Sequence, residues 1–317
     1  MTKLNNLLYK NLRGGMRAMA RYMNTKELSE YLGINEKKIY ALITEKRVPA
    51  TKITGKWIFP KELVDLWIEN SVENYPQTMR KLKGVLMIAG SNDPLLELVM
   101  SEIKKTESDF FPFFSIMGSL EGLTVLKNNK AHICGCHLLD TERKEYNFTF
   151  INSYLPDFKT VAINFAYRQQ GLLVKSNNPL KIKGIEDLGR HKIRFVNRQA
   201  GSGTRVLLDS YLKKLGIPAS GIKGYRTAVN THLEVGMSVL RGTADLGLGI
   251  KAVANGLGLG FIPLQEERFD LLIPEDYFFS EEVQRFLQVL GSSQFKQRAA
   301  SFGGYDTRDS GKVMNPS

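Results

Sequence analysis

The sequence predicts an α/β protein in two parts, a small N-terminal domain of short helices with a hairpin and a larger domain of alternating strands and helices. Three observations lead to this prediction. Residues 24–69 carry apolar residues at helical spacing around one hairpin pattern. Residues 70–83 are polar with a single proline, and after Lys83 short apolar runs alternate with helical patterns, which is typical of βα units with mainly parallel strands. A chain of 317 residues suffices for about two domains.

Two helices open the small domain. Asn24 is a favourable N-cap for the first, with Glu27 in its first turn, and Gly33 is expected to end it. Asn35 is expected to cap the second helix in the same way. Each helix carries an apolar stripe at the i, i+3, i+4 spacing of one buried face; the stripe residues are Leu28, Tyr31 and Leu32, then Ile39, Leu42 and Ile43.

A β-hairpin and a third helix complete the small domain. Residues 48–50 (Val-Pro-Ala) break the helical pattern, and residues 51–53 and 57–59 flank a Thr-Gly-Lys turn at 54–56. Pro60 fits the first position of a helix, where its missing N–H has little consequence. We expect this helix to carry the apolar residues Leu63, Val64, Leu66 and Trp67.

The first two helices have helix-turn-helix spacing, which leaves the outer face of the second helix free. An α-helix fits the major groove of DNA, where base edges carry a unique pattern of donors and acceptors. Lysines on the hairpin are well placed for phosphates, which give affinity rather than sequence information. The candidate DNA-binding residues are Lys37, Lys38, Tyr40, Ala41 and Thr44 on the second helix, with Lys52 and Lys56 on the hairpin.

The charge distribution agrees with a polyanionic partner for this end of the chain. Residues 1–83 hold 16 Lys and Arg against 8 Asp and Glu, a net charge of +8, whereas the other 234 residues hold 28 against 24, a net charge of +4. Such asymmetry favours a polyanionic partner for residues 1–83. On charge alone, a solvated basic tail is an equally good interpretation.

Motifs in the small domain carry a family resemblance: Val48-Pro49-Ala50, Lys52-Ile53, Gly55 to Pro60, Leu63 and Leu66-Trp67-Ile68. With these motifs, residues 23–69 resemble the excisionase/MerR-type winged helix-turn-helix. The resemblance implies double-stranded DNA as a partner, and a three-helix protein-interaction module is the alternative. Tyr40 and Ala41 stand where the family often has arginine, so its base preference does not carry over.

The larger domain contains a glycine-rich turn between a predicted strand and a predicted helix. Residues 197–205 (Asn-Arg-Gln-Ala-Gly-Ser-Gly-Thr-Arg) follow an apolar run and open a helical pattern. Small residues let backbone N–H groups approach a ligand, and the helix N-terminus adds partial positive charge, so this turn is a candidate anion site. Its side-chain donors are Ser202, Thr204 and either Arg198 or Arg205, the arginines offering charge-assisted bonds.

Two further turns follow the same logic. Residues 89–93 (Ala-Gly-Ser-Asn-Asp) lead from the first strand into a helix at Pro94, and residues 117–123 (Met-Gly-Ser-Leu-Glu-Gly-Leu) open the next helix. Three such turns can share one cleft where the strands of an open sheet end. The sequence has no triphosphate or dinucleotide motif, which favours a small oxyanion. The candidate ligand-binding residues are Ser91, Asn92, Ser119, Arg198, Ser202, Gly203, Thr204 and Thr231.

The chemistry of these turns favours a fully ionised anion. Hydroxyls and backbone N–H groups are donors, and the only carboxylates expected nearby, Asp93 and Glu121, lie in the first turns of helices, where the helix dipole explains them. Hydrogen phosphate carries its own donor and needs an acceptor. We therefore expect dianions to bind better than hydrogen phosphate, with sulfate as the main competitor.

Motifs along residues 84 to about 308 carry a second resemblance: Gly90–Asp93, Gly118–Leu123, Cys136–Asp140, Tyr146-Asn147, Arg168–Gly171, Asn197–Arg205, Gly224-Tyr225, Thr231-His232, Gly242–Ile250, Phe261–Leu264 and Gly304–Asp306. With these, the larger domain resembles the periplasmic-binding-protein-like domain found fused to helix-turn-helix regulators and to molybdenum-cofactor biosynthesis proteins. The loop at 198–204 is also similar to the anion loop of phosphate-binding transport proteins, and the Ser91 and Ser119 turns to those of molybdate-binding proteins.

The resemblance implies a type II two-lobed fold with a ligand between the lobes. The chain is expected to cross the hinge near 160–167 and 269–273. Lobe I would then span about 84–160 and 272–317, and lobe II about 165–268. Molybdate or tungstate is the ligand that the resemblance implies.

Some other polar positions admit two interpretations each. For the Cys134–His137 segment, a packed strand end is favoured over a metal or redox site. His232 either contacts the ligand or caps a helix, with no preference, and Asp245 fits a turn carboxylate better than a ligand contact. Arg168 is either a hinge ion-pair partner or a ligand contact. No nucleophile–base or paired-carboxylate arrangement is visible, so we expect no enzyme activity, no bound metal cation and no cofactor.

These observations predict a DNA-binding transcriptional regulator, expected as a homodimer, that senses an oxyanion. The alternative is a cytosolic oxyanion-binding accessory protein in molybdenum-cofactor biosynthesis, although the chain has no room for a pterin-handling domain. No secretory signal, no run near the ~20 apolar residues of a membrane span and only two cysteines predict a cytoplasmic protein with no membrane partner. The predicted division is a tail over 1–20, the winged helix-turn-helix domain over 21–70, a linker over 71–83 and the oxyanion-binding domain over 84–317.

Overall fold

The computed structural model describes five ranges of the chain, residues 21–71, 84–106, 108–156, 158–190 and 192–316. They form two compact units, divided between Gln77 and Thr78, and each unit is described by itself. The predicted tail and all of the predicted linker except Ser71 lie outside the described residues. Within those ranges, no helix combines the length and the apolar character that crossing a bilayer requires.

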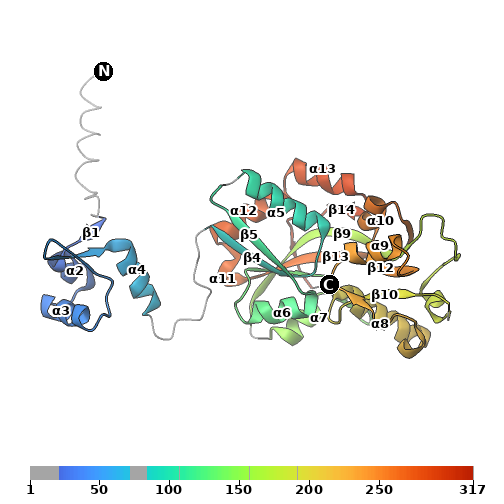
Figure 1. The fold of residues 1–317 in the computed structure, drawn as a ribbon, viewed down its shortest axis with the longest axis horizontal. Helices are drawn as coiled ribbons and strands as arrows, with labels where there is room; N and C mark the ends of the chain where they lie inside the picture. The colour runs from blue at the N-terminus through green and yellow to red at the C-terminus, as the bar shows by residue number, and fades with distance from the viewer. Residues whose placement is uncertain (1–20, 72–83, 107, 157, 191, 317) are drawn as a thin grey trace, which may run out of the picture. The chain divides into compact units, whose positions relative to one another are not determined.

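The first unit, over its described residues, consists of three helices and a sheet in the order β1-β3-β2 (Figure 1). Both strand pairs are antiparallel, and β2 with β3 forms the predicted hairpin. The short β1 strand is an addition to the predicted elements, because two residues leave no periodic pattern. The bounds are β1 (Tyr22–Met23), α2 (Thr25–Leu32), α3 (Glu36–Thr44), β2 (Thr51–Ile53), β3 (Lys56–Pro60) and α4 (Lys61–Asn70).

Side-chain caps start the first two helices where the sequence predicts them. The Asn24 side chain accepts a hydrogen bond from Glu27 N at 3.0 Å, and the Glu27 carboxylate accepts one from Asn24 N at 2.8 Å, which is a complete capping box. Asn35 caps α3 through its side chain. The third helix differs from the prediction by one residue, because Pro60 ends β3 and takes the N-cap position, so α4 begins at Lys61.

A small apolar core holds the first unit together. The hydroxyl of Tyr31 in α2 donates to the Asp65 carboxylate in α4 at 2.7 Å, which ties the first helix to the third. Leu63 and Leu66 of α4 are about half exposed and take no part in the core. The buried core residues are Met23, Leu28, Ile39, Val48, Phe59 and Val64.

The second unit is built on one ten-stranded sheet, whose main path runs β11-β10-β12-β9-β13-β6-β4-β5, with β14 and β15 beside β9. Strands β7 and β8 form a separate antiparallel pair. Strands β4, β5 and β6 are parallel to one another, as are β10, β11 and β12. The expectation of mainly parallel strands therefore holds within each half, but the long strands β9 and β13 that join the halves are antiparallel. The bounds are β4 (Val85–Gly90), β5 (Phe111–Ile116), β6 (Ile133–Cys136), β7 (Leu139–Asp140), β8 (Glu145–Tyr146), β9 (Thr160–Val174), β10 (Phe195–Arg198), β11 (Ala228–Val229), β12 (Leu246–Ile250), β13 (Gly260–Pro274), β14 (Tyr305–Asp306) and β15 (Val313–Met314).

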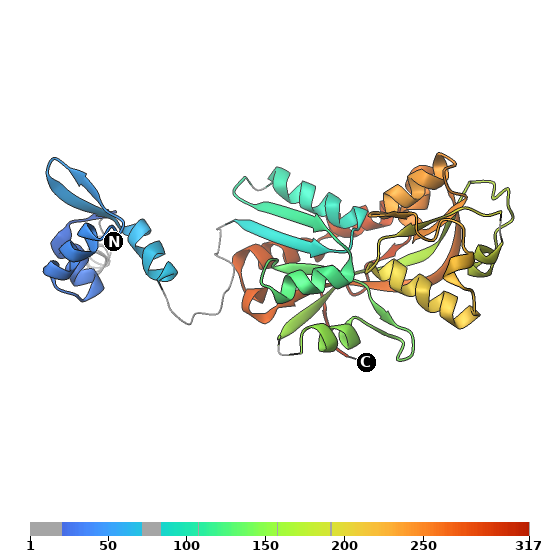
Figure 2. The ribbon, with the colours of Figure 1, turned by 60° about the horizontal axis from the view of Figure 1, so that its bottom comes forward.

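Helices cover both faces of each half and make two lobes, so the predicted two-lobed α/β fold is confirmed (Figure 1, Figure 2). In lobe I, α5, α12 and α13 pack on one face of β4–β6, and α6 and α7 on the other. In lobe II, α8 and η1 cover one face of β10–β12, and α9 and α10 the other. The bounds are α5 (Pro94–Thr106), α6 (Ser119–Lys127), α7 (Phe148–Tyr154), η1 (Ile185–Gly189), α8 (Gly203–Leu215), η2 (Ala219–Gly221), α9 (His232–Leu240), α10 (Lys251–Leu257), α11 (Glu275–Phe278), α12 (Glu281–Leu290) and α13 (Ser293–Phe302).

Two long strands connect the lobes. β9 and β13 pair along their whole lengths, and only the C-terminal part of β9 pairs with β12 of lobe II. The N-terminal part of β9 instead pairs with β14 and β15, so the C-terminal end of the chain lies against the lobe I part of this strand. β13 has register shifts between Pro263 and Gln265 and between Phe269 and Asp270, and such bulges bend a strand.

Candidate functional site

Three serine-bearing turns lie together where the strands end. Ser91 follows β4 and Ser119 begins α6; their hydroxyl oxygens are 2.8 Å apart, and both residues are buried. Gly118, with φ at 90°, touches the third turn, because a Cβ on it would lie 3.2 Å from the backbone of Ser202. The turns that the sequence singles out therefore meet, two from lobe I and one from lobe II.

The two hydroxyls of the third turn have different roles. Ser202 is the N-cap of α8, because its Oγ accepts from Arg205 N at 3.2 Å and donates to Gln199 O at 3.0 Å. Thr204 Oγ1 accepts from Gln170 Nε2 at 3.0 Å, which leaves the threonine's own hydroxyl hydrogen for another acceptor. Thr204 is therefore better suited than Ser202 to donate to a ligand.

Arg198 is a buried cation with no carboxylate within ion-pair distance in the described part of the chain. It ends β10 and is 1% exposed. Its Nη2 donates to Asn230 O at 2.8 Å and its Nε to Gln199 Oε1 at 3.2 Å, whereas Nη1 has no partner among the described residues. Burial, reinforced by the charge of Arg168, lowers the pKa of Arg198 to about 9. A buried cation without a counter-charge is costly, so an anion is the partner that this position lacks.

Further buried polar atoms near Arg198 also have no partner among the described residues. They are Arg168 Nη2, Gln199 Nε2, Gln170 Oε1 and both ring nitrogens of His232. His232 is the first residue of α9 and is fully buried, while the preceding Thr231 caps the helix. Burial and the charges of Arg198 and Arg168 hold the pKa of His232 well below its usual range. Of the two interpretations left open for His232, the cap is thus excluded.

Arg168 is the centre of a buried ion-pair network. Its Nη1 donates to Asp93 Oδ2 at 2.6 Å and its Nε to Glu267 Oε1 at 2.5 Å. His137 Nδ1 lies 2.8 Å from Glu267 Oε2. Burial raises the pKa of Glu267, but Arg168 and His137 outweigh it and lower that pKa to about 2. The network supports the hinge ion-pair interpretation of Arg168. One of its partners, Asp93, precedes α5 of lobe I, and the other, Glu267, lies in β13, one of the two strands that connect the lobes.

The expectation that Asp93 and Glu121 are the only carboxylates nearby is wrong. Glu267 is buried in the site, and Glu121 is exposed on α6. The oxygens of both buried carboxylates are nevertheless already occupied. Asp93 Oδ1 accepts from the backbone N–H groups at the start of α5, and its Oδ2 accepts from Arg168 and from Tyr305 OH. Both Glu267 oxygens bind the network. Of the unpartnered buried atoms, those of Arg168, Arg198 and Gln199 are donors, whereas Gln170 Oε1 is an acceptor.

The other predicted ligand residues lie around these groups. Asn92 is buried, and its amide donates to a carboxylate in α5. Gly203 packs against His137, because a Cβ on it would lie 2.7 Å from the imidazole Cε1. The hydroxyl of Thr231 accepts from Glu234 N at 3.0 Å and lies 3.0 Å from the Glu234 carboxylate, to which it donates. Thr231 therefore holds its own helix rather than presenting a free donor.

Two charged residues beside the turns are engaged elsewhere. Arg205 pairs with Asp209 at 3.0 Å, one turn further along α8. Asp245 pairs with Arg194 at 2.7 Å, which agrees with a turn carboxylate rather than a ligand contact. Of the two arginines that the sequence offered at the third turn, Arg198 is therefore the candidate.

The cysteine segment has the character of a packed strand. Cys134 and Cys136 are free, fully buried residues of β6. Burial raises the pKa of Cys136 to about 12, so its thiol stays protonated. Among the described residues, no group of three or more His, Cys, Asp and Glu side chains is placed to hold a metal ion.

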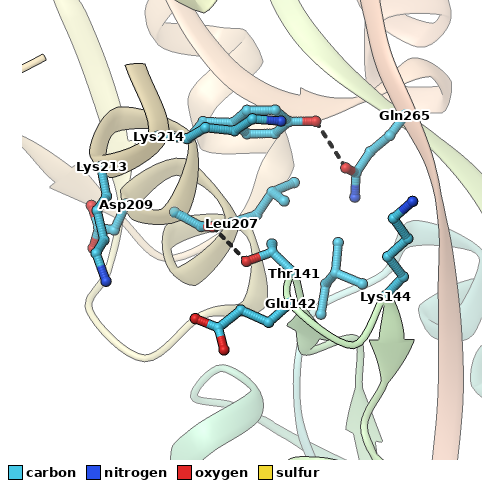
Figure 3. A pocket seen from close by; sticks show the side chains of 11 residues that line it. Thr141, Glu142, Lys144, Leu207, Asp209, Lys213, Lys214 and Gln265 are labelled. Carbon is cyan, nitrogen blue, oxygen red and sulfur yellow. Dashed lines mark hydrogen bonds between the residues drawn. The ribbon is translucent and has the colours of Figure 1, made fainter. Parts of the chain in front are cut away.

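A separate cavity of about 810 Å³ lies between the β7–β8 turn and α8 (Figure 3). The hydroxyls of Thr141 and Ser210 are 2.9 Å apart beside it, and Tyr211 OH donates to Gln265 at 2.9 Å. None of the unpartnered buried atoms of the described residues belongs to its lining. The cavity is therefore distinct from the candidate anion site.

Sequence reasoning missed Gln199, His137 and Glu267. Gln199 lies inside the 197–205 turn and its amide counts as a donor there, so the signal was present. Glu267 lies in a polar stretch of β13 that has no motif. Only the pairing of β13 with β9, in which Glu267 is the direct cross-strand partner of Arg168, brings it into the site.

The candidate DNA-binding face of the first unit is solvent-exposed. Ile39 of α3 is fully buried, so the helix turns its apolar side into the core. On the hairpin, Lys56 is exposed at the turn, and Lys52 Nζ lies 5.5 Å from the centre of the Trp57 ring. The exposed residues of α3 include all five that the sequence proposes, Lys37, Lys38, Tyr40, Ala41 and Thr44.

The fold and the site define a class: a DNA-binding regulator that carries a periplasmic-binding-protein-like ligand-binding domain. Residues 100–291 match the family model described as PBP superfamily domain, and residues 22–71 match one described as helix-turn-helix domain. The chain belongs to the PBP superfamily.

Two curated relatives and a solved structure are among the proteins similar to this chain. Protein YvgK of Bacillus subtilis (strain 168) is 29% identical over 304 residues, which cover 91% of this chain and 96% of that protein. A Clostridium pasteurianum protein from the 5′ region of the ferredoxin 2Fe-2S gene is 34% identical over 110 residues, 34% of this chain and 97% of that protein. A phosphate ABC transporter substrate-binding protein from Clostridium perfringens, solved with bound phosphate, has a TM-score of 0.52 at 17% identity, over 69% of this chain and 97% of that one, and therefore shares the fold.

Proposed function

We propose that this protein is a transcriptional regulator that binds DNA through α3 and the β2–β3 hairpin and binds a small oxyanion, molybdate or tungstate, between its two lobes. The observation that carries the anion part is Arg198, a buried guanidinium that has an unpartnered nitrogen and no ion-paired carboxylate among the described residues. The proposal includes a homodimer, because helix-turn-helix proteins read two half-sites about 34 Å apart. The proposal also includes a cytoplasmic location, because a DNA-binding regulator must share a compartment with its DNA.

The free groups of the site favour a dianion. Among the described residues, Arg198, Arg168 and Gln199 each offer an unpartnered N–H group, and Thr204 offers a hydroxyl hydrogen. These donors outnumber the free amide oxygen of Gln170, which is an acceptor. The buried carboxylates already accept from arginine, tyrosine and backbone groups, so they are poorly placed to accept the proton of hydrogen phosphate. The preference for a dianion thus depends on the occupied oxygens of Asp93 and Glu267, although the sequence predicts no Glu267 in the site.

The choice among dianions rests on the serine turns. Ser91 and Ser119 are similar to the turns of molybdate-binding proteins, and their hydroxyls lie 2.8 Å apart. Sulfate carries the same charge and is smaller, so it is the main competitor. Phosphate also belongs among the test ligands, because the C. perfringens protein of the same fold was solved with it.

Calorimetric titration of the full chain with molybdate, tungstate, sulfate and phosphate tests the ligand. We expect micromolar affinity for molybdate and tungstate, weaker binding of sulfate and little heat from phosphate. Phosphate binding equal to or tighter than molybdate would overturn the ligand assignment and the donor argument with it.

Replacing the arginine tests the site. Arg198→Met should weaken molybdate binding by about 10- to 100-fold or more, since a hydrogen bond to a charged group contributes roughly 1.5–3 kcal/mol. Removing an unneutralised buried cation should not lower the stability of the anion-free protein, which separates a binding defect from misfolding. Arg194→Met is the matched control, because Arg194 precedes the same strand but pairs with Asp245. Equal losses in both variants would contradict the assignment.

A further inference from the structure

The fixed charges around the candidate anion site cancel. Two guanidinium groups, Arg168 and Arg198, stand against two carboxylates, Asp93 and Glu267, which gives a net charge of zero when the neighbouring histidines are neutral. All four side chains are buried. A dianion that enters this cluster therefore brings two negative charges that the present groups do not balance, and buried charge without compensation is costly.

His232 is the group that can supply the missing positive charge. It is fully buried, and neither ring nitrogen has a hydrogen-bond partner among the described residues. The charged groups facing it come from three strands: Arg198 of β10, Arg168 of β9 and His137 directly after β6. Every one of these is a cation or a potential cation. The ring therefore stays neutral while no anion is bound, and its two nitrogens remain available to a ligand and a proton.

The nearby carboxylates do not compensate His232. Glu267 of β13 accepts from Arg168 and His137. Glu234, on the same helix as His232, accepts from the backbone N–H of Asn230 and of Thr231. Neither carboxylate is free to stabilise a protonated His232, so protonation requires the negative charge of a bound anion.

We propose that His232 binds the oxyanion directly and takes up a proton as the anion enters, so that anion affinity is linked to pH. The inference deepens the proposed function and rests on it. The bound anion supplies the acceptor for one ring N–H, and the added positive charge reduces the uncompensated charge of the site from −2 to −1.

The other histidines are less suited to this role. The chain has four, and His191 lies outside the described residues. His137 already holds Glu267 through Nδ1. His132 accepts from Met87 N at 2.9 Å and packs edge-on against Tyr277, away from the serine turns. His132 therefore offers a matched control for a buried histidine that does not meet the anion.

Calorimetry of the wild-type chain with molybdate, in two buffers of different ionisation enthalpy, measures protons taken up per anion bound. We expect about one proton near pH 7. Affinity should fall by up to about 10-fold for each unit that pH rises, in the window above the pKa of the free imidazole and below that of the bound one. Binding without proton uptake would overturn the inference and leave the proposed function standing, whereas failure of all four anions to bind would overturn both.

Variants assign the proton to a residue. His232→Gln keeps a donor and an acceptor but cannot titrate, so it should bind molybdate more weakly, without proton uptake and without pH dependence. His232→Asn should behave in the same way and guards against a folding defect of one variant. His132→Gln should retain the proton uptake of the wild type. Undiminished uptake in both His232 variants would assign the proton to another group and overturn the inference.

Discussion

Two buried arginines of this protein differ in what surrounds them. Arg168 meets Asp93 and Glu267 at 2.6 and 2.5 Å, so its charge is neutralised within the fold. Arg198 is equally buried, but within the described part of the chain its guanidinium donates only to a backbone carbonyl and to a side-chain amide oxygen. A paired buried ion stabilises the arrangement of its neighbours, whereas an unpaired one is retained at a cost and so points to a ligand.

At the third serine turn, two hydroxyl substitutions should separate stability from binding. Ser202→Ala removes the cap of α8 and should lower the free energy of unfolding by about 0.5–2 kcal/mol. Thr204→Val preserves shape, removes the free hydroxyl hydrogen and should weaken molybdate binding by about 10-fold or more. Urea unfolding and calorimetric titration of both variants provide the measurements. If Ser202→Ala lost the affinity and Thr204→Val kept it, the roles assigned to the two hydroxyls would be reversed.

Acid should destabilise the anion-free protein through His232. Its folded-state pKa is held well below the usual range by burial and by Arg198, so below about pH 6.5 the unfolded chain binds a proton that the folded chain does not. Stability is therefore fully present above pH 6.5 and falls as pH drops. Between pH 7.5 and 5.5 the wild type should lose more of its free energy of unfolding than His232→Gln in urea unfolding. An identical loss in both proteins would contradict a neutral buried imidazole.

At the scale of elements, the sequence predicts what is local. The caps at Asn24 and Asn35 and the hairpin over 51–59 follow from residues a few positions apart, and the structure has them. The sequence also predicts the three serine turns, because glycine and serine between a strand and a helix form a local pattern. The antiparallel pairing of β9 with β13 joins residues about 100 positions apart, and no local pattern encodes it. The Arg168–Glu267 pair depends on that pairing and was therefore missed.

The exposed face of α3 should be the DNA-recognition surface. Lys37→Glu combined with Lys38→Glu replaces two cations by two anions next to phosphate and should abolish duplex binding, while molybdate affinity stays unchanged. Wild-type binding should also weaken steeply with salt through counterion release. Gel shifts with a duplex selected from a random pool by the wild-type chain provide the measurement. Lys104→Glu with Lys105→Glu, at the end of α5 in the other unit, is the matched control.

Normal DNA affinity in the Lys37 and Lys38 double variant would remove the recognition role from α3. Anion binding by a wild-type chain with no affinity for any duplex would instead favour an oxyanion-binding accessory protein. Substitution of Lys37 and Lys38 should change the free energy of unfolding little. Both side chains are exposed, and the core contact of α3 is made by the buried Ile39.

At the scale of the whole molecule, the chain forms two compact units that carry different candidate sites. The first exposes Lys37 and Lys38 on α3, and the second encloses polar groups from both lobes. An anion can alter DNA binding only if the DNA-bound and DNA-free proteins differ in their affinity for that anion. The turns that meet at Gly118 and Ser202 belong to different lobes, so occupancy of the site bears directly on how the lobes are held.

If the anion regulates DNA binding, DNA must affect anion binding to the same extent. If saturating molybdate changes the Kd for the selected duplex by some factor, saturating duplex must change the Kd for molybdate by the same factor, because both express one coupling free energy. We expect a factor between about 5 and 150, which corresponds to roughly 1–3 kcal/mol. Fluorescence anisotropy with labelled duplex and calorimetry with molybdate measure the two sides. Arg198→Met should keep its DNA affinity and lose the response to molybdate. A DNA affinity that is the same with and without bound molybdate would show that the two units act independently, and the regulator would then need another signal.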